Sequence, residues 1–377
     1  VRFMPSTSPG EARFTLIVLA VLALAGLALG WNKGQLSRPI EPAASATADA
    51  DISPDLALYR DVIAEVRSGR DYYAVAGEKI PHYGFPIGSP LNWRLPTYAW
   101  VFSWLPGPAW IQAALVALSI VALGLAFVAQ SRAAGVGYAA LTTFLLFGVV
   151  RWAIDGQAFL AQEPWAATLM IVSLSAHALA AQQGRWRVLA VAAGIAALLF
   201  RELALPYCLV ACAFAAHKRR WSEAAGWAAG IALFFGFFAW HVGQVKAQLA
   251  GTEVAGAAGL AQWLRFGGLD FILLTTRMNS LLFAASPWLL WLFLLLSLVG
   301  LSRSRDESNK IACLAALLYL VAFAVVGRPE NFYWGLLSAP LLVWGSSQAP
   351  RCLADLWQRA ASPTIRVTTD KPLLTHG

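Results

Sequence analysis

The chain is organised around residues 53–97, which read SPDLALYRDVIAEVRSGRDYYAVAGEKIPHYGFPIGSPLNWRLPT. This segment is the one long polar and aromatic insert in a sequence that otherwise consists mostly of apolar runs. It carries many charged side chains, which membrane-spanning helices avoid because a charge in hydrocarbon is costly. The segment is therefore predicted to lie outside the membrane, and its Asp55 carboxyl group is the candidate catalytic group.

The composition indicates a polytopic membrane protein. Of the 377 residues, 59% are hydrophobic and 13% are charged, and the mean hydropathy is +0.60. Soluble domains contain about 45–50% apolar and about 25% charged residues. The net charge of +8 does not indicate nucleic-acid binding, because the basic residues form short clusters between apolar runs, where they set topology. The four cysteines show no CxxC spacing and no histidine at ligand spacing, so neither a disulfide framework nor a zinc site is expected.

The first apolar run covers residues 14–31 and follows two arginines. At about 1.5 Å per residue it can cross about 30 Å of hydrocarbon. Basic residues before an apolar core also fit a cleaved signal peptide, but the length of the run favours a retained helix. In both cases the following segment lies outside. Nine more apolar runs follow, at residues 108–128, 135–150, 165–181, 188–200, 203–216, 224–240, 278–301, 311–327 and 332–345.

We therefore expect an all-α fold of about ten transmembrane helices with a long first extracytoplasmic loop. The predicted order is a cytoplasmic N-terminus (1–13), a first transmembrane helix (14–31), an extracytoplasmic catalytic loop (32–97), a bundle of about nine further helices (98–348) and a cytoplasmic tail (349–377). With the N-terminus inside, 15 of the 28 Lys and Arg residues fall in inner segments and seven in the long loop, which leaves six in the other outer segments. This asymmetry agrees with the positive-inside rule.

Two short helices are predicted in the first loop. Ser53 and Pro54 suit the N-cap and first turn of an amphipathic helix that Gly69 ends, and we expect this helix to lie on the outer membrane face. Its apolar positions recur at helical spacing at Tyr59, Val62, Ile63 and Val66. Asp71 is the predicted N-cap of a second helix, residues 72–79, which Pro81 closes. Residues 82–96 are rich in Gly, Pro and aromatic residues and predict a structured loop.

A charged pair interrupts the apolar stretch at residues 188–216. Basic clusters flank both ends of this stretch, so both ends are predicted to be cytoplasmic and the chain must turn at Arg201-Glu202. Each arm is about 20 Å long, which is short for a full crossing. We predict a hairpin of short or broken helices with an ion pair at its tip. Charge at that depth normally faces a cavity or a partner, and this makes the pair a functional candidate.

The outer loops collect nearly all the chemically interesting side chains. The predicted outer-facing polar groups are Asp55, Asp61, Glu65, Arg94, Asp155, Gln157, Glu163, Arg201, Glu202, Arg328, Glu330, Asn331 and Tyr333. Asp61 lies about 240° around the helix from Asp55, so the two carboxylates are not expected to share a site. The inner loops carry mainly basic residues. Any chemistry is therefore predicted on the extracytoplasmic side.

Several short motifs resemble those of the GT-C class of polyprenyl-phosphate-dependent glycosyltransferases, with a closer likeness to bacterial mannosyltransferases that build cell-surface glycans. The likeness covers about residues 50–345. The motifs are Asp55-Leu-x-x-Tyr59, Gly69 with Tyr72-Tyr73, Gly156-Gln157, Gly184-Arg185-Trp186, Arg201 where relatives often carry Lys, ArgLeuProThr at 94–97, and ArgProGluAsnPheTyrTrpGly at 328–335. The last two look like features of a subgroup tied to cell-surface glycopolymer formation.

The resemblance implies a mechanism and a set of partners. Asp55 would be the general base that takes the proton of an acceptor hydroxyl, and the displacement would invert the anomeric centre. Arg201 and Arg328 would stabilise the departing lipid-linked phosphate. Further substrate-binding candidates are Tyr59, Arg94, Gln157, Glu163, Glu202, Asn331 and Tyr333. The partners implied are a polyprenyl-phosphate-linked sugar donor, a glycan or glycolipid acceptor and the lipid bilayer. The protein is expected in the bacterial inner (cytoplasmic) membrane, with the site facing the periplasm or the exterior.

Alternative interpretations accompany these assignments. Asp55 could simply complement the helix dipole, and Arg201-Glu202 could be a self-neutralised structural pair.

The last outer loop has no His, a residue that some relatives place near the sugar phosphate. No cofactor or metal is predicted, since the first loop has no adjacent acidic pair. A transporter or flippase of lipid-linked sugars is the alternative function, although the paired broken helices frequent in transporters are not evident.

Overall fold

The computed structural model describes residues 8–32, 53–90, 92–250, 265–303 and 306–362. Within these ranges the regular secondary structure is helical throughout, which confirms the predicted all-α class. The α-helices are α1 (Pro9–Asn32), α2 (Pro54–Arg67), α3 (Tyr72–His82), α4 (Thr97–Ser103), α5 (Pro108–Ala134), α6 (Val136–Val150), α7 (Gln162–Ala180), α8 (Trp186–Phe200), α9 (Leu205–His217), α10 (Trp221–Leu249), α11 (Gly268–Thr276), α12 (Pro287–Ser302), α13 (Glu307–Val325), α14 (Gly335–Ser346) and α15 (Ala349–Ala361). Short 3₁₀ turns are η1 (Arg151–Ala153), η2 (Ala158–Leu160), η3 (Glu202–Ala204), η5 (Ser280–Leu282) and η6 (Pro329–Trp334).

Five of these helices are long and apolar enough to cross a membrane, judged by length and composition: α1, α5, α6, α10 and α13. Three shorter apolar stretches accompany them, at Trp186–Phe200, Glu202–His217 and Pro287–Ser302. Each of the ten predicted apolar runs contains one helix, but the count of ten membrane spans remains a prediction. The long first helix, the break after Phe200 and the helices α5 and α6 lie where the sequence indicated.

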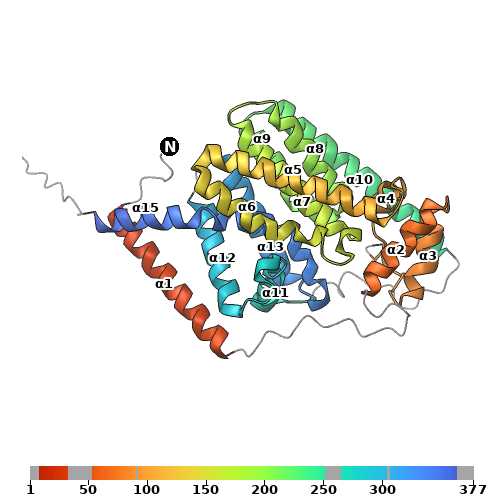
Figure 1. The fold of residues 1–377 in the computed structure, drawn as a ribbon, viewed down its shortest axis with the longest axis horizontal. Helices are drawn as coiled ribbons and strands as arrows, with labels where there is room; N and C mark the ends of the chain where they lie inside the picture. The colour runs from red at the N-terminus through yellow and green to blue at the C-terminus, as the bar shows by residue number, and fades with distance from the viewer. Residues whose placement is uncertain (1–7, 33–52, 91, 251–264, 304–305, 363–377) are drawn as a thin grey trace, which may run out of the picture.

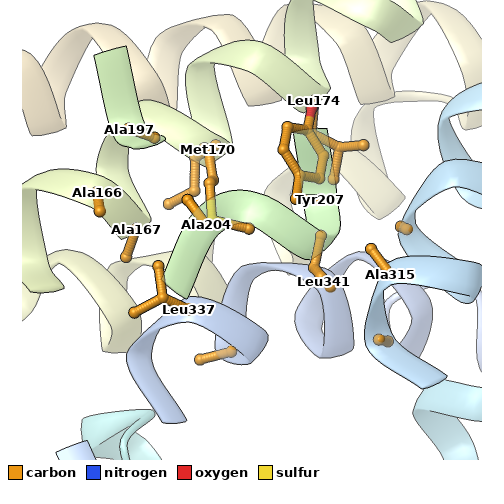
Figure 2. Packing of buried hydrophobic residues seen from close by; sticks show 14 of the residues in the cluster. Ala166, Ala167, Met170, Leu174, Ala197, Ala204, Tyr207, Ala315, Leu337 and Leu341 are labelled. Carbon is orange, nitrogen blue, oxygen red and sulfur yellow. The ribbon is translucent and has the colours of Figure 1, made fainter. Parts of the chain in front are cut away.

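Helix α7 forms the centre of the bundle, because nearly all its residues are buried. It packs against α5, α6, α8, α13 and α14. Figure 2 shows why these helices approach closely: small side chains such as Ala166 and Ala167 of α7 lie near Ala197 of α8 and Leu337 of α14. Small residues at helix contacts favour close packing in membrane proteins, where no hydrophobic force drives helices together.

Helices α2, α3 and α4 lie together at one end of the molecule, opposite α1 and α15 (Figure 1). They share a second apolar core with the N-terminal part of α5 and with η2. Tyr59, Val62 and Ile63 of α2 belong to this core and are buried. The apolar face that we expected to meet the membrane is therefore covered by protein, because α3 and α4 fold back over it.

Several boundaries differ from the predicted ones. Helix α3 continues through Pro81 to His82, and the apolar run predicted from residue 278 becomes helical only at Pro287, after the short turn η5. The short helices α4 and α11 were not predicted. The predicted tail contains α15, which packs against α1 and α12. A Pro in the first turn of α12 explains its late start, since Pro is favoured there.

Candidate active site

Helix α2 places Asp55 and Tyr59 on the same side of the protein. Ser53 lies at the N-cap with an extended backbone, and Pro54 opens the helix as predicted, although the Ser53 side chain makes no capping hydrogen bond. Asp55 therefore falls in the first turn, where the helix dipole favours a carboxylate. Residues four apart share one helix face, so the Tyr59 hydroxyl extends the same polar surface. Asp55 is half-buried and Tyr59 is buried.

Arg94 joins α2 to the last outer loop. Its Nε donates to the Tyr59 hydroxyl at 2.9 Å, and one terminal nitrogen donates to the Tyr333 hydroxyl at 3.1 Å. The Tyr333 hydroxyl in turn lies 3.4 Å from Oδ1 of Asn331. These contacts bring together residues 35 and 239 positions apart in the chain. Four of the predicted site residues thus form one hydrogen-bonded group.

The break between α8 and α9 supplies a second group of interacting side chains, which consists of charged residues. Arg201 has an extended backbone after the last turn of α8, and its side chain is only 1% exposed. One terminal nitrogen donates to Oε1 of Glu202 at 2.7 Å, which is the predicted ion pair at the hairpin tip. Its Nε lies 2.8 Å from Oε1 of Glu163, a buried residue in the first turn of α7. Arg201 is therefore neutralised by two carboxylates rather than one.

The two groups interact electrostatically around Asp55. Burial raises the pKa of the Asp55 carboxyl, Arg94 opposes that rise, Glu163 adds to it and Arg201 opposes it. Burial also raises the pKa of Tyr59 well above its ordinary value, so this phenol is neutral at physiological pH. Three carboxylates and two guanidinium groups thus meet in one region. A carboxylate with a raised pKa is a stronger proton acceptor than an exposed one.

The remaining predicted residues lie at the edge of this region or beyond it. Arg328 is part-exposed and lies 3.9 Å from Glu330. Gln157 precedes η2, and its buried side-chain oxygen has no hydrogen-bond partner within the described part of the chain. The pairing of Arg201 with Arg328 across one phosphate therefore stays a prediction.

No group of three or more His, Cys, Asp or Glu side chains is placed to hold a metal ion among the residues that the structure describes. The expectation of a metal-independent site also stays a prediction. Asp61, which was predicted to lie apart, accepts a hydrogen bond from the Tyr83 hydroxyl at 2.6 Å. Its neighbours are thus different from those of Asp55.

Two supporting contacts of the backbone at residues 93 and 94 were not predicted from the sequence. The Tyr72 hydroxyl donates to the carbonyl oxygen of Arg94 at 2.5 Å, and His241 of α10 lies 3.2 Å from the carbonyl oxygen of Trp93. Asp71 caps α3 as predicted by accepting from the backbone N–H groups of Tyr73 and Ala74. The Tyr72-Tyr73 pair was visible as a motif. His241 gave no signal, because a single His in a long apolar helix has no partner that sequence spacing can reveal.

Comparison with known proteins gives a likeness of fold. No family model and no curated protein matches the sequence. The crystal structure of ArnT from Cupriavidus metallidurans bound to undecaprenyl phosphate matches with a TM-score of 0.51 at 15% identity, over 90% of this chain and 62% of the ArnT chain. The apo structure of the same ArnT gives a TM-score of 0.45 at 15% identity, over 92% and 62% of the two chains. The protein therefore has a fold similar to that of ArnT over nine-tenths of its length, while it spans less than two thirds of the ArnT chain.

Proposed function

We propose that this protein is an integral membrane glycosyltransferase of the GT-C type that moves a sugar from a polyprenyl-phosphate donor to an acceptor hydroxyl. The observation that carries the proposal is the half-buried Asp55 carboxylate, whose pKa is raised by burial and on which Arg94 and Arg201 act electrostatically. The ArnT-like fold supports it, since the matching crystal structure of ArnT holds undecaprenyl phosphate. The motifs of residues 55–59 and 328–335 support the same class.

The proposed reaction is a single displacement at the anomeric carbon. The acceptor oxygen forms a bond to that carbon while the bond from carbon to the phosphate oxygen breaks, and the bonding pair leaves with the phosphate. The acceptor proton passes to Asp55. A general base of this kind typically contributes about 10²–10⁴-fold to the rate. Attack from the face opposite the leaving group would invert the anomeric configuration.

Arg94 is the better placed of the two central guanidinium groups to meet a phosphate. Its hydrogen-bond partners are the neutral hydroxyls of Tyr59 and Tyr333, and among the residues that the structure describes no carboxylate contacts it directly. Arg201 contacts two carboxylates and is buried. Preorganised cations stabilise charge that develops on a leaving phosphate, and a guanidinium can bind two phosphate oxygens at once. We assign the first phosphate contact to Arg94, with Arg201 holding Glu163 and Glu202 in place.

The finer assignments extend this proposal. The sugar is mannose or a related hexose, and the acceptor is a cell-envelope glycan or glycolipid. The site faces the periplasm of the bacterial inner membrane. These points are supported by the likeness of residues 94–97 and 328–335 to proteins of cell-surface glycopolymer formation, and by the basic residues that cluster in the opposite loops.

The central test replaces Asp55 with Asn. Purified protein in liposomes would receive radiolabelled polyprenyl-phosphate mannose and an envelope glycan extract from a strain that lacks the protein. We expect Asp55→Asn to lower the rate of transfer by about 10²–10⁴-fold, because the acceptor proton loses its receiver. Binding of undecaprenyl phosphate, measured by native mass spectrometry, should be retained.

Asp61→Asn is the matched control, since it makes the same chemical change six residues further along α2, on a side chain that accepts a hydrogen bond from Tyr83. It should transfer sugar at close to the wild-type rate. Mass spectrometry of envelope glycans from the deletion strain, complemented with each variant, would identify the missing sugar. Full glycan synthesis by the Asp55→Asn variant would contradict the enzymatic proposal and favour a transporter of lipid-linked sugars.

A further inference from the structure

His241 is a buried polar residue inside the long apolar helix α10. Its side chain is fully buried, and α10 is one of the five helices long and apolar enough to span a membrane. A buried imidazole costs free energy unless its nitrogens find partners. Both nitrogens have them here. Nδ1 lies 3.0 Å from the Tyr73 hydroxyl, and Nε2 lies 3.2 Å from the carbonyl oxygen of Trp93.

The chemistry of the two partners fixes which ring nitrogen carries the hydrogen when the imidazole is neutral. A carbonyl oxygen only accepts hydrogen bonds, so Nε2 must carry the hydrogen and donate it to Trp93. In a neutral imidazole Nδ1 is then an acceptor, and it receives the hydrogen of the Tyr73 hydroxyl. The ring therefore links α3, through Tyr73, to the peptide group that immediately precedes Arg94.

The backbone on both sides of this peptide group is also held. The next carbonyl, that of Arg94, accepts from the Tyr72 hydroxyl at 2.5 Å. The Trp93 indole N–H donates to the carbonyl oxygen of Ile87 at 2.9 Å, and a Cβ at Gly77 would lie 3.3 Å from the Trp93 ring. The carbonyl groups of Trp93 and Arg94 are thus held by side chains from α10 and α3. These two hydrogen bonds fix the backbone at Arg94 and so the direction of its side chain.

We infer that His241 is a positioning residue of the active site: through Trp93 and Tyr73 it fixes the Arg94 guanidinium, which donates to Tyr59 on the helix that carries Asp55. This inference rests on the proposed function, in which Arg94 meets the donor phosphate and Asp55 takes the acceptor proton. It assigns a task to a residue about 150 positions further along the chain, in a helix that supplies no other group to the site. A residue that merely filled the core would need only the shape of an aromatic ring.

The test reads the protonation of Asp55 directly and needs no sugar substrate. A hydrophobic carbodiimide modifies protonated carboxyl groups, so the extent of Asp55 labelling against pH, measured by peptide mass spectrometry, gives the midpoint of its titration. The charged and titratable groups that act on Asp55 are Arg94 of the loop, Glu163 of α7, Arg201 after α8, and the phenols of α2 and η6. Displacement of Arg94 should raise the midpoint, because a positive charge beside the carboxylate is lost.

We expect Arg94→Gln to raise the labelling midpoint of Asp55 by about one pH unit. His241→Phe, which keeps an aromatic ring but makes no hydrogen bond, should raise it by at least half that amount. Tyr73→Phe removes a single hydroxyl and should shift it in the same direction. His241→Gln can still donate to the Trp93 carbonyl, and it should restore most of the wild-type value.

Tyr207→Phe is the control, because it removes a buried hydroxyl that bonds Ser173 and touches none of the site residues. Its midpoint should equal that of the wild type. Unchanged midpoints in His241→Phe and Tyr73→Phe would overturn the inference, and so would an unchanged midpoint in Arg94→Gln. The labelling experiment measures the titration of Asp55, whereas the assay of Asp55→Asn measures sugar transfer. A failure of the proposed function would therefore appear in the transfer assay, and a failure of the positioning role would appear in the labelling midpoints.

Discussion

Arg94 and Arg201 have the same side chain in two opposite environments. Arg94 donates to two phenol hydroxyls, which carry no charge, whereas Arg201 contacts two carboxylates. A guanidinium bonded to neutral acceptors keeps a positive field that an anion can exploit, and one enclosed by carboxylates does not. Arg94 is therefore suited to binding an anion, whereas Arg201 is suited to holding its two carboxylate partners in place.

The pH dependence of transfer should report this arrangement. Asp55 must be ionised to accept a proton, and burial raises its pKa. Activity should therefore be present above that raised pKa and lost as the pH falls through it, at a higher pH than for an exposed aspartate of pKa about 3.9. The measurement is kcat/KM for sugar transfer against pH.

Two substitutions should move the low-pH fall of this kcat/KM profile, its acidic limb, in opposite directions. Glu163→Gln removes a negative charge that raises the pKa of Asp55, so the limb should move to lower pH. Arg94→Gln removes a positive charge that opposes the rise, so the limb should move to higher pH. Shifts of the same sign in both variants would show that another group controls the profile.

The sequence predicted some of these residues and could not predict others. Asp55 and Tyr59 were named because Asp55-Leu-x-x-Tyr59 resembles a motif of GT-C glycosyltransferases. Glu163 was named as a candidate, but its contact with Arg201 depends on how α7 packs beside α8, which no local pattern encodes. The meeting of Arg94 with Tyr333 joins residues 239 positions apart and required the whole fold.

At the scale of elements, the break between α8 and α9 is the best supported prediction. Basic residues at both ends of the stretch required a turn, and the helix does end at Phe200 and resume at Leu205. The helices α4 and α11 were missed because seven and nine residues are too few to show a periodic pattern. The late start of α12 was missed because apolar content alone does not separate a turn from a helix.

Arg201→Ala should destabilise the protein strongly. The substitution leaves the Glu163 carboxylate, 2% exposed, without its partner, and removal of one partner of a buried ion pair typically costs about 3–5 kcal/mol. Thermal unfolding in detergent should show a large fall in Tm. Glu202→Gln is the comparison, since Glu202 is more exposed and Arg201 keeps Glu163, and its Tm should fall much less.

The contact between α12 and α14 depends on two glycines. A Cβ at Gly300 would lie 1.9 Å from the carbonyl oxygen of Gly345, and a Cβ at Gly345 would lie 2.2 Å from the carbonyl oxygen of Ser297. Backbone atoms cannot rotate away, so the helices must separate. Gly345→Ala should lower the free energy of unfolding by at least about 1–3 kcal/mol, measured by denaturant titration. Gly124→Ala on α5 meets no atom within 4 Å and should have little effect.

At the scale of the whole molecule, the proposed orientation can be tested with cysteines in a variant that lacks the four native ones. Ser68, after α2, and Gln183, between α7 and α8, are both exposed. A membrane-impermeant maleimide added to spheroplasts should label Ser68→Cys and spare Gln183→Cys until the membrane is permeabilised, because the two loops are predicted to lie on opposite sides. Labelling of Gln183→Cys in intact spheroplasts would reverse the assigned direction.

The length of α8 has a consequence for how the protein meets its membrane. Its 15 residues rise about 22 Å, whereas the hydrocarbon layer is about 30 Å thick. With its first turn at the cytoplasmic boundary, the arginine at its far end rests several ångströms below the outer water. The height of Arg201 above the cytoplasmic boundary is set by the length of α8, while the thickness of the hydrocarbon layer is set by the acyl chains of the membrane lipids. A thicker host membrane would place this charge further below the water, so lipid composition becomes a determinant of how costly it is to keep Arg201 and its two carboxylate partners buried.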